Sequence, residues 1–287
     1  MLSQEFMRNA LLAGTFVALA CGVGGWFVVL RGQVFAGDAL SHVAFPGALA
    51  AAAAGVDERI GLFVATVVVA VAIGALGRGV LSRAGGASSP ADDTAIGIAF
   101  TFILGLGAFF LARVSVSSAG ASGVLGAHTL FGSIFGLSAG EARLAAAIGL
   151  ATTLLLVAIA RPLLFASVAP EVAAARGVPA RALAIGFLAL LGVIAAEATQ
   201  VVGALLLLGL LAAPAAAAHR AVSSPFVGIA LAALLALVAM WAGLALAYAI
   251  PSLPPSSAIV IVAVAINYGS ALLARGRPTG RPRRSRA

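Results

Sequence analysis

Apolar stretches of about 20 residues recur along the whole chain of 287 residues. Each is long enough to cross a hydrocarbon core of about 30 Å as an α-helix. Lipid offers the backbone no hydrogen-bond partner, so a helix, which satisfies its own backbone groups, is the expected form. Hydrophobic residues make up 62% of the chain and charged residues 9%, against roughly 25% charged residues in a soluble domain. The sequence therefore predicts an integral membrane protein without a soluble domain.

We expect an all-α fold, a polytopic transmembrane helical bundle of about eight to ten spans. Nine candidate spans lie near 11–30, 34–54, 60–80, 94–112, 142–160, 182–197, 200–218, 226–249 and 256–274. The stretch 115–140 is rich in serine and glycine, and it is compatible with a short extra span, a re-entrant element or a surface loop. Residues 1–274 are thus expected to form one transmembrane domain.

The basic residues limit the chemistry and suggest an orientation. All seventeen are arginine, so a GxxxxGK[ST] phosphate loop, which needs its lysine, is absent, and any ATP hydrolysis would belong to another polypeptide. Six arginines lie among proline and glycine in 275–287. This segment is expected to be a disordered basic tail in the cytoplasm rather than a nucleic-acid-binding segment, because cytoplasmic segments carry an excess of arginine.

Sidedness follows from the tail for the C-terminal half only. Four spans back from the tail, 161–181 is also expected inside, with the turns at 197–200 and 251–255 outside. In the N-terminal half, either orientation leaves several arginines outside. The side of the N-terminus stays open, because it depends on whether 115–140 crosses the membrane.

Asp38 and His42 lie four residues apart in GDALSHVAFPG, residues 37–47. A carboxylate inside a span costs roughly 2.5–3.5 kcal/mol on the lenient insertion scale, so it marks an ion path or a functional pair by default. Residues i and i+4 share one face of a helix. A carboxylate with an imidazole is a borderline ligand set that suits Zn²⁺ or Mn²⁺. The spacing alone also allows a neutral histidine hydrogen-bonded to the aspartate without metal.

Two further residues are secondary candidates for an ion path. Glu197, near Gln200 at the expected outward turn, is placed to receive a cation, with a simple solvated turn as the alternative. His128 reaches a path only if 115–140 re-enters the membrane. Neither an HExxH pair nor a GxSxG elbow occurs, so these catalytic motifs do not suggest an enzyme.

The surroundings of Asp38 and His42 resemble a known family. GWFVVLRGQVFAGDALSHVAFPGALAA, residues 25–51, resembles a signature of the membrane permease subunits of bacterial ABC importers for zinc, manganese or ferrous iron. Three further segments match in the same order: DDTAIGIAFTFILGLGAFFLA (92–112), LFGSIFGLS (130–138) and VVGALLLLGLLAAPAAAA (201–218). Together these segments cover nearly the whole chain.

This resemblance implies a transport subunit of the bacterial inner membrane, not an enzyme, that imports a divalent metal by alternating access. It implies that Asp38 and His42 contact the metal in passage and that no cofactor is permanently bound. The implied partners are a second permease copy, two cytoplasmic ATPase subunits that bind ATP, and an extracytoplasmic metal-binding protein.

Residues 164–181, LFASVAPEVAAARGVPAR, resemble the loop by which such permeases dock on their ATPase. Pro170, Glu171, Ala174 and Gly177 fall on its pattern, and Gly177 is expected to end a short helix at positive φ. Many relatives carry an aspartate before this proline, where this chain has Ala169.

Two other functions stay open on the sequence. An ABC permease for metal chelates such as siderophores or cobalamin shares the many-span architecture, but it would not need Asp38 and His42 to contact a bare cation. An ion-coupled secondary carrier is the other, and association with an ATPase would exclude it. The sequence does not identify the metal, nor whether the pair belongs to an outer or an inner gate.

Overall fold

The computed structural model describes residues 4–76, 90–117, 132–204 and 207–275, and these residues form helices without any strand. The long helices are α1 Glu5–Leu30, α2 Val34–Ala53, α3 Glu58–Leu76, α4 Pro90–Ser117, α6 Ala139–Val168, α8 Ala180–Val201, α9 Leu207–Ala221, α10 Pro225–Ala249 and α11 Pro255–Arg275. Two short elements are the 3₁₀ turn η1 Ile134–Gly136 and the helix α7 Pro170–Ala175. The all-α membrane bundle is therefore confirmed.

The long helices correspond one to one with the candidate spans. In the described part of the chain, seven helices are long and apolar enough to cross a membrane, while α9 and the 100–113 part of α4 are shorter apolar helices. The boundaries differ most for α6, which continues through Pro162 to Val168, whereas the candidate span ends near 160. This extension carries α6 directly to α7.

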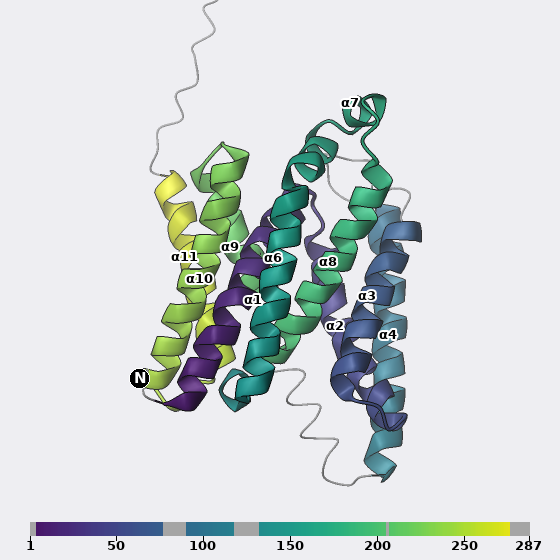
Figure 1. Cartoon of the computed structure of the whole chain (residues 1–287), viewed down its shortest axis with the longest axis vertical. Helices are drawn as coiled ribbons and strands as arrows, with labels where there is room; N and C mark the ends of the chain where they lie inside the picture. Colours follow the sequence, from purple (N-terminus) through teal and green to yellow (C-terminus); the bar gives the residue numbers. More distant parts are fainter. Residues whose placement is uncertain (1–3, 77–89, 118–131, 205–206, 276–287) are drawn as a thin grey trace, which may run out of the picture.

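Successive long helices run in opposite directions (Figure 1). α7 lies at one end of the bundle, together with the α1–α2 turn and the last residues of α11; the N-terminus lies at the opposite end (Figure 1). α4 ends and α6 begins at that opposite end. Most of the ambiguous stretch, 118–131, including His128, lies outside the described residues.

α1 is the central helix, and it packs against α6, α8, α9 and α10. Two glycines let its neighbours approach closely. A Cβ atom on Gly25 would lie 1.9 Å from the Leu211 carbonyl oxygen of α9, and one on Gly22 would lie 2.5 Å from the Ala233 Cα of α10. Small residues at such crossings are the usual means of close packing in membranes, where lipid is as apolar as the side chains.

The helices α2, α3 and α4 form one side of the molecule, and α8 joins them to the rest through its contacts with α2 and α3 (Figure 1). α2 and α3 cross at Gly47 and Gly61. A Cβ on Gly61 would lie 2.4 Å from the Gly47 carbonyl oxygen, and the reverse substitution would be nearly as close. This crossing fixes α2, the helix that carries Asp38 and His42.

Candidate metal site

Asp38 and His42 lie on one face of α2, in the half of the helix nearer α7. His42 Nε2 is 3.9 Å from Asp38 Oδ1, and their side chains are 17% and 31% exposed. This separation is too long for a hydrogen bond, so the two side chains are not hydrogen-bonded to each other. A Zn–N bond and a Zn–O bond are each about 2.0–2.2 Å long, so their summed length slightly exceeds the 3.9 Å between the two atoms. One ion can therefore contact both atoms with little movement.

The residues around the pair leave its ligand atoms available. Ser41 is fully buried, and its hydroxyl donates to the Asp38 backbone carbonyl at 2.6 Å, which leaves the Asp38 carboxylate free of that hydroxyl. The His42 ring meets the Phe100 ring of α4 edge-on, with centroids 5.2 Å apart. Pro46 lies inside α2 and has no N–H to donate to the carbonyl of residue i−4. The His42 carbonyl oxygen is therefore a third acceptor beside the pair.

The pair alone does not make a resident metal site. In the described ranges, no group of three or more histidine, cysteine, aspartate or glutamate side chains could hold a metal ion. Structural zinc sites use four protein ligands and catalytic ones three. The arrangement is suited to transient contact, or to completion by groups from another chain.

Glu197 has a partner that sequence reasoning did not identify. Its carboxylate is 3% exposed, and Arg59 Nη2 of α3 donates to Oε1 at 3.1 Å and to Oε2 at 3.4 Å. Glu197 is therefore a buried, paired residue near the end of α8, not a solvated turn residue. No pattern in the sequence links it to Arg59, because 138 residues separate the two.

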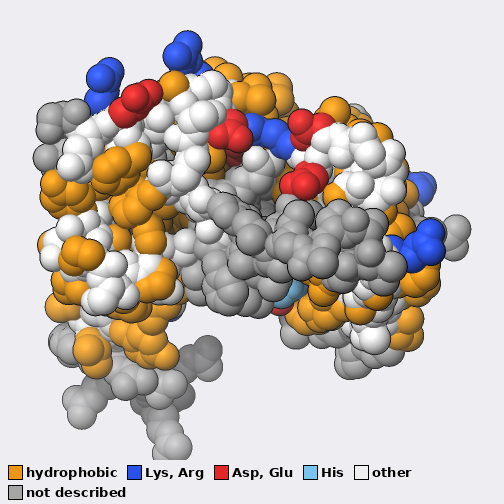
Figure 2. Space-filling model, turned by 90° about the horizontal axis from the view of Figure 1, so that it is seen from below, with side chains coloured by type: hydrophobic (Ala, Val, Ile, Leu, Met, Phe, Trp, Pro, Cys, Tyr) orange, Lys and Arg blue, Asp and Glu red, His pale blue; other side chains and the backbone are white. Residues whose placement is uncertain are grey.

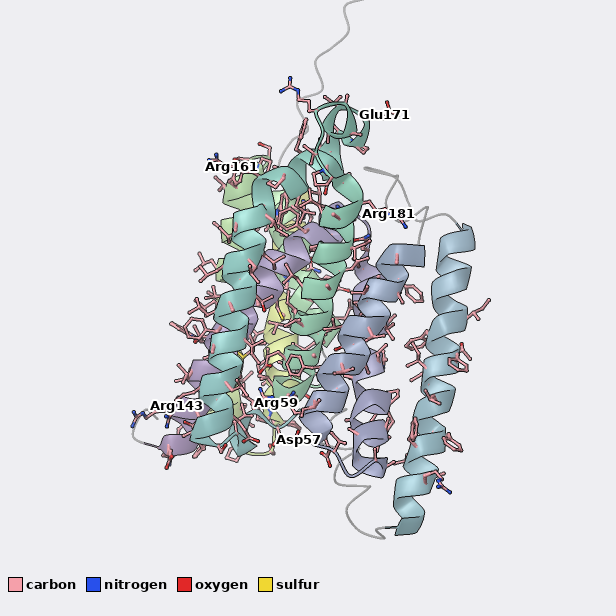
Figure 3. The ribbon with its side chains drawn as sticks, turned by 45° about the vertical axis from the view of Figure 1, so that its right-hand side comes forward. Asp57, Arg59, Arg143, Arg161, Glu171 and Arg181 are labelled. Atoms are coloured by element: carbon pink, nitrogen blue, oxygen red, sulfur yellow. The ribbon has the colours of Figure 1, made fainter. Side chains whose placement is uncertain are left out.

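Further acidic residues lie at the same end of the bundle. Asp57 and Arg59 belong to the turn between α2 and α3 and the first turn of α3 (Figure 3). Seen from this end, acidic side chains gather around a basic one near the middle of the face (Figure 2). Glu141 caps α6, because its carboxylate accepts from the Ser138 backbone N–H at 2.9 Å while Ser138 accepts from the Glu141 N–H. These contacts give Glu141 a structural role.

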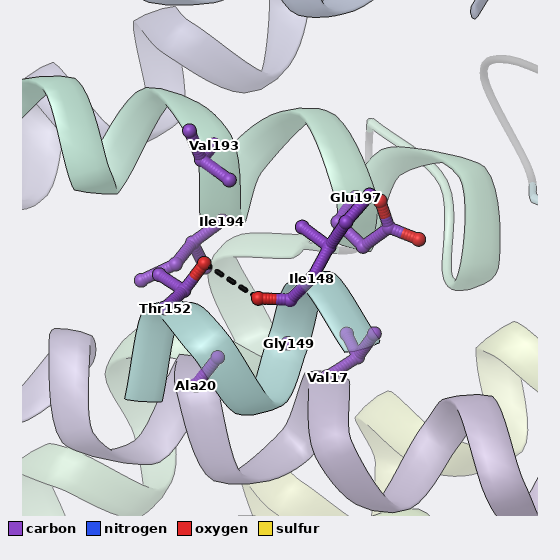
Figure 4. Close-up of a pocket in the computed structure, with 8 residues that line it drawn as sticks. All are labelled: Val17, Ala20, Ile148, Gly149, Thr152, Val193, Ile194 and Glu197. Atoms are coloured by element: carbon purple, nitrogen blue, oxygen red, sulfur yellow. Dashed lines mark hydrogen bonds between the residues drawn. The ribbon is translucent and has the colours of Figure 1, made fainter. Parts of the chain in front are cut away.

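A small cavity beside Glu197 does not extend the candidate site. It lies between α1, α6 and α8, and its other lining residues are Val17, Ala20, Ile148, Gly149, Thr152, Val193 and Ile194 (Figure 4). The Thr152 hydroxyl donates to the Ile148 carbonyl at 2.7 Å. Glu197 is thus the one charged residue in an otherwise apolar lining, so the cavity offers a cation no second charged ligand.

The third histidine has a structural position. His219, in the last turn of α9, stacks on Trp26 of α1 with ring centroids 4.7 Å apart, and its Nε2 lies 3.0 Å from the Trp26 carbonyl oxygen. These contacts join α9 to α1 at the α7 end of the bundle. The stacked arrangement accounts for His219 without a metal.

The expected docking segment projects from the bundle. α7 begins with Pro170, which suits the first helical position because its missing N–H is not needed there. Gly177 has φ +75° and donates its N–H to the Ala174 carbonyl at 3.0 Å, so the expected positive-φ cap is confirmed. Glu171 is exposed near the tip (Figure 3), and Val172 is 51% exposed. The short helix thus exposes an acid and an apolar side chain at the end of the bundle.

Comparison with known proteins identifies the family. The model of the ABC 3 transport family matches residues 3–274. The manganese transport system membrane protein MntC of Halalkalibacterium halodurans is 32% identical over 85% of this chain and 79% of its own length. A probable iron transport system membrane protein of Haemophilus influenzae is 30% identical over 74% of this chain and 73% of its own length.

A solved structure agrees with these sequence matches. PsaBC from Streptococcus pneumoniae in complex with Fab superposes with a TM-score of 0.78 at 28% identity, covering 93% of this chain and 91% of that one. The chain therefore belongs to the ABC 3 transport family, as the membrane permease subunit of a metal-ion ABC importer in which a separate subunit hydrolyses ATP.

Proposed function

We propose that this permease passes a bare divalent ion, Mn²⁺, Zn²⁺ or Fe²⁺, along a path in which Asp38 and His42 contact it directly. The observation that carries the proposal is the open pair on α2: a carboxylate oxygen and an imidazole nitrogen 3.9 Å apart, both partly exposed, within an apolar helix. Unpaired polar groups are rarely kept inside a span without a function. Relatives named for manganese and for iron transport support a bare ion over a bulky chelate.

Two protein ligands per subunit suit passage better than storage. A closed tetrahedral set would hold zinc tightly, whereas conduction requires that an ion leave as readily as it enters. The pair, with the His42 carbonyl, would replace part of the hydration shell of the ion. A second permease copy that brings its own pair to the same path would complete the shell, and we therefore propose a homodimer.

The arginines support an orientation with the α7 end in the cytoplasm. The described residues place six arginines at that end: Arg31, Arg161, Arg176, Arg181, Arg220 and Arg275. Four lie toward the opposite end: Arg8, Arg59, Arg113 and Arg143. Cytoplasmic segments carry the excess of arginine. With this orientation the N-terminus is extracytoplasmic, and Asp38 and His42 lie in the cytoplasmic half of α2.

We assign a different partner to each end of the helix bundle. α7 would enter a cleft of a cytoplasmic ATPase subunit, two of which serve the two permease copies. The opposite end, with its acidic side chains, would receive a metal-binding protein. Binding and hydrolysis of ATP would move α7, and the packing around α2 would alternate between two openings.

Transport by the reconstituted complex tests the proposal. Permease, ATPase and binding protein in liposomes are assayed for ATP-dependent uptake of Mn²⁺, Zn²⁺ and Fe²⁺, each against the other two, with Asp38→Ala, His42→Ala and the exposed control Glu5→Ala. We expect both path variants to keep ATP hydrolysis but lose uptake, and Glu5→Ala to match the wild type. Unchanged uptake in both path variants refutes the path. Uptake without ATP would indicate a secondary carrier, and uptake only of chelated metal a chelate permease.

A further inference from the structure

Arg31 is a partly buried cation in the short turn that joins α1 to α2. Among the acidic residues whose side chains the structure describes, none has a carboxylate within ion-pair distance of it. Burial lowers the pKa of its guanidinium below the usual value. A buried charge without a counter-charge is costly unless its environment is organised around it. The contacts of Arg31 show what that organisation is.

On one side, Arg31 contacts both helices that hold α7. Its Nη1 donates to the Ser167 hydroxyl at 2.8 Å, and its guanidinium carbon lies 5.6 Å from the centroid of the Phe187 ring. Ser167 is the second-last residue of α6, and Ala169 both ends α6 and precedes α7. Phe187 belongs to α8, which begins four residues after Arg176. α7 packs against α6 and α8, so displacement of α7 moves the residues that Arg31 touches.

On the other side, Arg31 holds the start of α2. Its Nε donates to the Gln33 side-chain oxygen at 3.2 Å. Gln33 precedes the first residue of α2, and its backbone carbonyl accepts from the Gly37 N–H at 3.1 Å, next to Asp38. The turn is itself tightly bonded, since the Gln33 N–H donates to the Val28 carbonyl at 2.9 Å. Movement of the Arg31 side chain would therefore act on the first turn of α2, the helix that carries Asp38 and His42.

We propose that Arg31 is a positioning residue that couples movement of α7 to the position of Asp38 and His42. The planar fork of arginine fixes two partners in set directions, which the single ammonium of lysine cannot do. The Gln33 side-chain nitrogen is buried without a hydrogen-bond partner, and some N–H groups of Arg31 are not used in the contacts above. These spare donors allow a second arrangement of the turn in which other acceptors are engaged. The inference rests on the proposed function, because it assumes that α7 meets an ATPase.

The test measures ions imported per ATP hydrolysed by the complete complex in liposomes. Arg31→Lys keeps the charge but loses the fork, and Ser167→Ala removes one acceptor with little change in volume. Arg161→Lys is the matched control, because Arg161 is an exposed arginine on the same α6 helix. Ions imported per ATP should fall at least about fivefold in Arg31→Lys, the lower end of typical coupling between sites, and less in Ser167→Ala. Arg161→Lys should leave the ratio unchanged.

A structural role gives a different result. If Arg31 only stabilises the fold, uptake and hydrolysis fall together and the ratio stays constant, which overturns the proposal. If Arg31→Lys does not assemble, Ser167→Ala decides alone: a lower ratio supports coupling, and an unchanged ratio refutes it. The wild-type complex tests the proposed function separately, because absence of any ATP-dependent metal uptake there refutes that function whatever the variants do.

Discussion

The buried ion pair between Arg59 and Glu197 makes an asymmetric prediction about stability. Glu197 is 3% exposed, whereas Arg59 is 21% exposed and has Asp57 and Glu141 at the same end of the bundle (Figure 3). Removing Arg59 therefore leaves a buried carboxylate without its partner, and removing the carboxylate leaves an arginine that can turn to water. Breaking a buried pair costs about 3–5 kcal/mol when the remaining charge stays buried. An exposed charge pair is worth only about 1 kcal/mol or less.

The predicted costs follow for substitutions of similar shape. Arg59→Met should lower the free energy of unfolding by about 3 kcal/mol at pH 7. The upper limit is about 3.7 kcal/mol, the cost of protonating a carboxyl of ordinary pKa, about 4.3, at that pH. Glu197→Gln should cost about 1 kcal/mol. The double variant should resemble Glu197→Gln alone, because it leaves no unpaired buried carboxylate, so the second substitution rescues the first.

Unfolding of the detergent-solubilised protein by titration with a denaturing detergent measures these differences. Lowering the pH to 5 should reduce the cost of Arg59→Met to about 1 kcal/mol, since less free energy is then needed to protonate the carboxyl. The wild type supplies the baseline at each pH. A larger loss for Glu197→Gln than for Arg59→Met, or no rescue in the double variant, would refute the assignment of the buried charge to Glu197.

Three further predictions test packing, docking and orientation. Gly25→Ala should destabilise the protein or prevent its assembly, because its Cβ would overlap the Leu211 carbonyl oxygen, whereas Gly105→Ala, with no atom within 4 Å, should be neutral in the same unfolding titration. Gly177→Ala has space for its Cβ but must hold φ +75°, which costs about 1–2 kcal/mol. Less ATPase should therefore co-purify, while the melting temperature of the isolated permease should fall by only a few degrees. In a Cys21→Ala background, a membrane-impermeant maleimide should label Ser252→Cys in intact cells and Ala174→Cys only after lysis, and the reverse pattern would invert the proposed orientation.

Local patterns in the sequence were sufficient to predict the helices and the common face of Asp38 and His42. A run of apolar residues specifies a membrane helix without reference to the rest of the chain, which is why all nine candidate spans match helices. The i, i+4 spacing of Asp38 and His42 is equally local, and the structure keeps both on one face of α2. The positive φ of Gly177 follows from the same kind of signal.

Contacts between distant segments were not predictable in this way. Arg59 meets Glu197 across 138 residues and Arg31 meets Ser167 across 136, and no periodicity connects such pairs. Arg31 directly follows one apolar helix and Arg59 lies in the first turn of another. In the sequence, each therefore looks like an arginine at the membrane interface. Only the crossing of helices, set by close approaches such as Gly47 on Gly61, brings these polar groups together in an apolar bundle.

The distribution of charge gives a physical reason for the direction of transport in the proposed orientation. At the end that is extracytoplasmic in this orientation, the acids Asp57, Glu58 and Glu141 lie at the start of α3 and of α6. Their negative charge would offset part of the cost of removing water from an arriving divalent cation. At the α7 end the described residues include six arginines, against the acids Glu171 of α7 and Asp92 and Asp93 in the first turn of α4. A cation released there meets positive potential, which favours its departure into the cytoplasm and opposes its return. Asp38 and His42 lie in the half of α2 nearer those arginines. In the proposed path the pair would therefore hold the ion close to the side of release, and an incomplete ligand set would select the metal without trapping it.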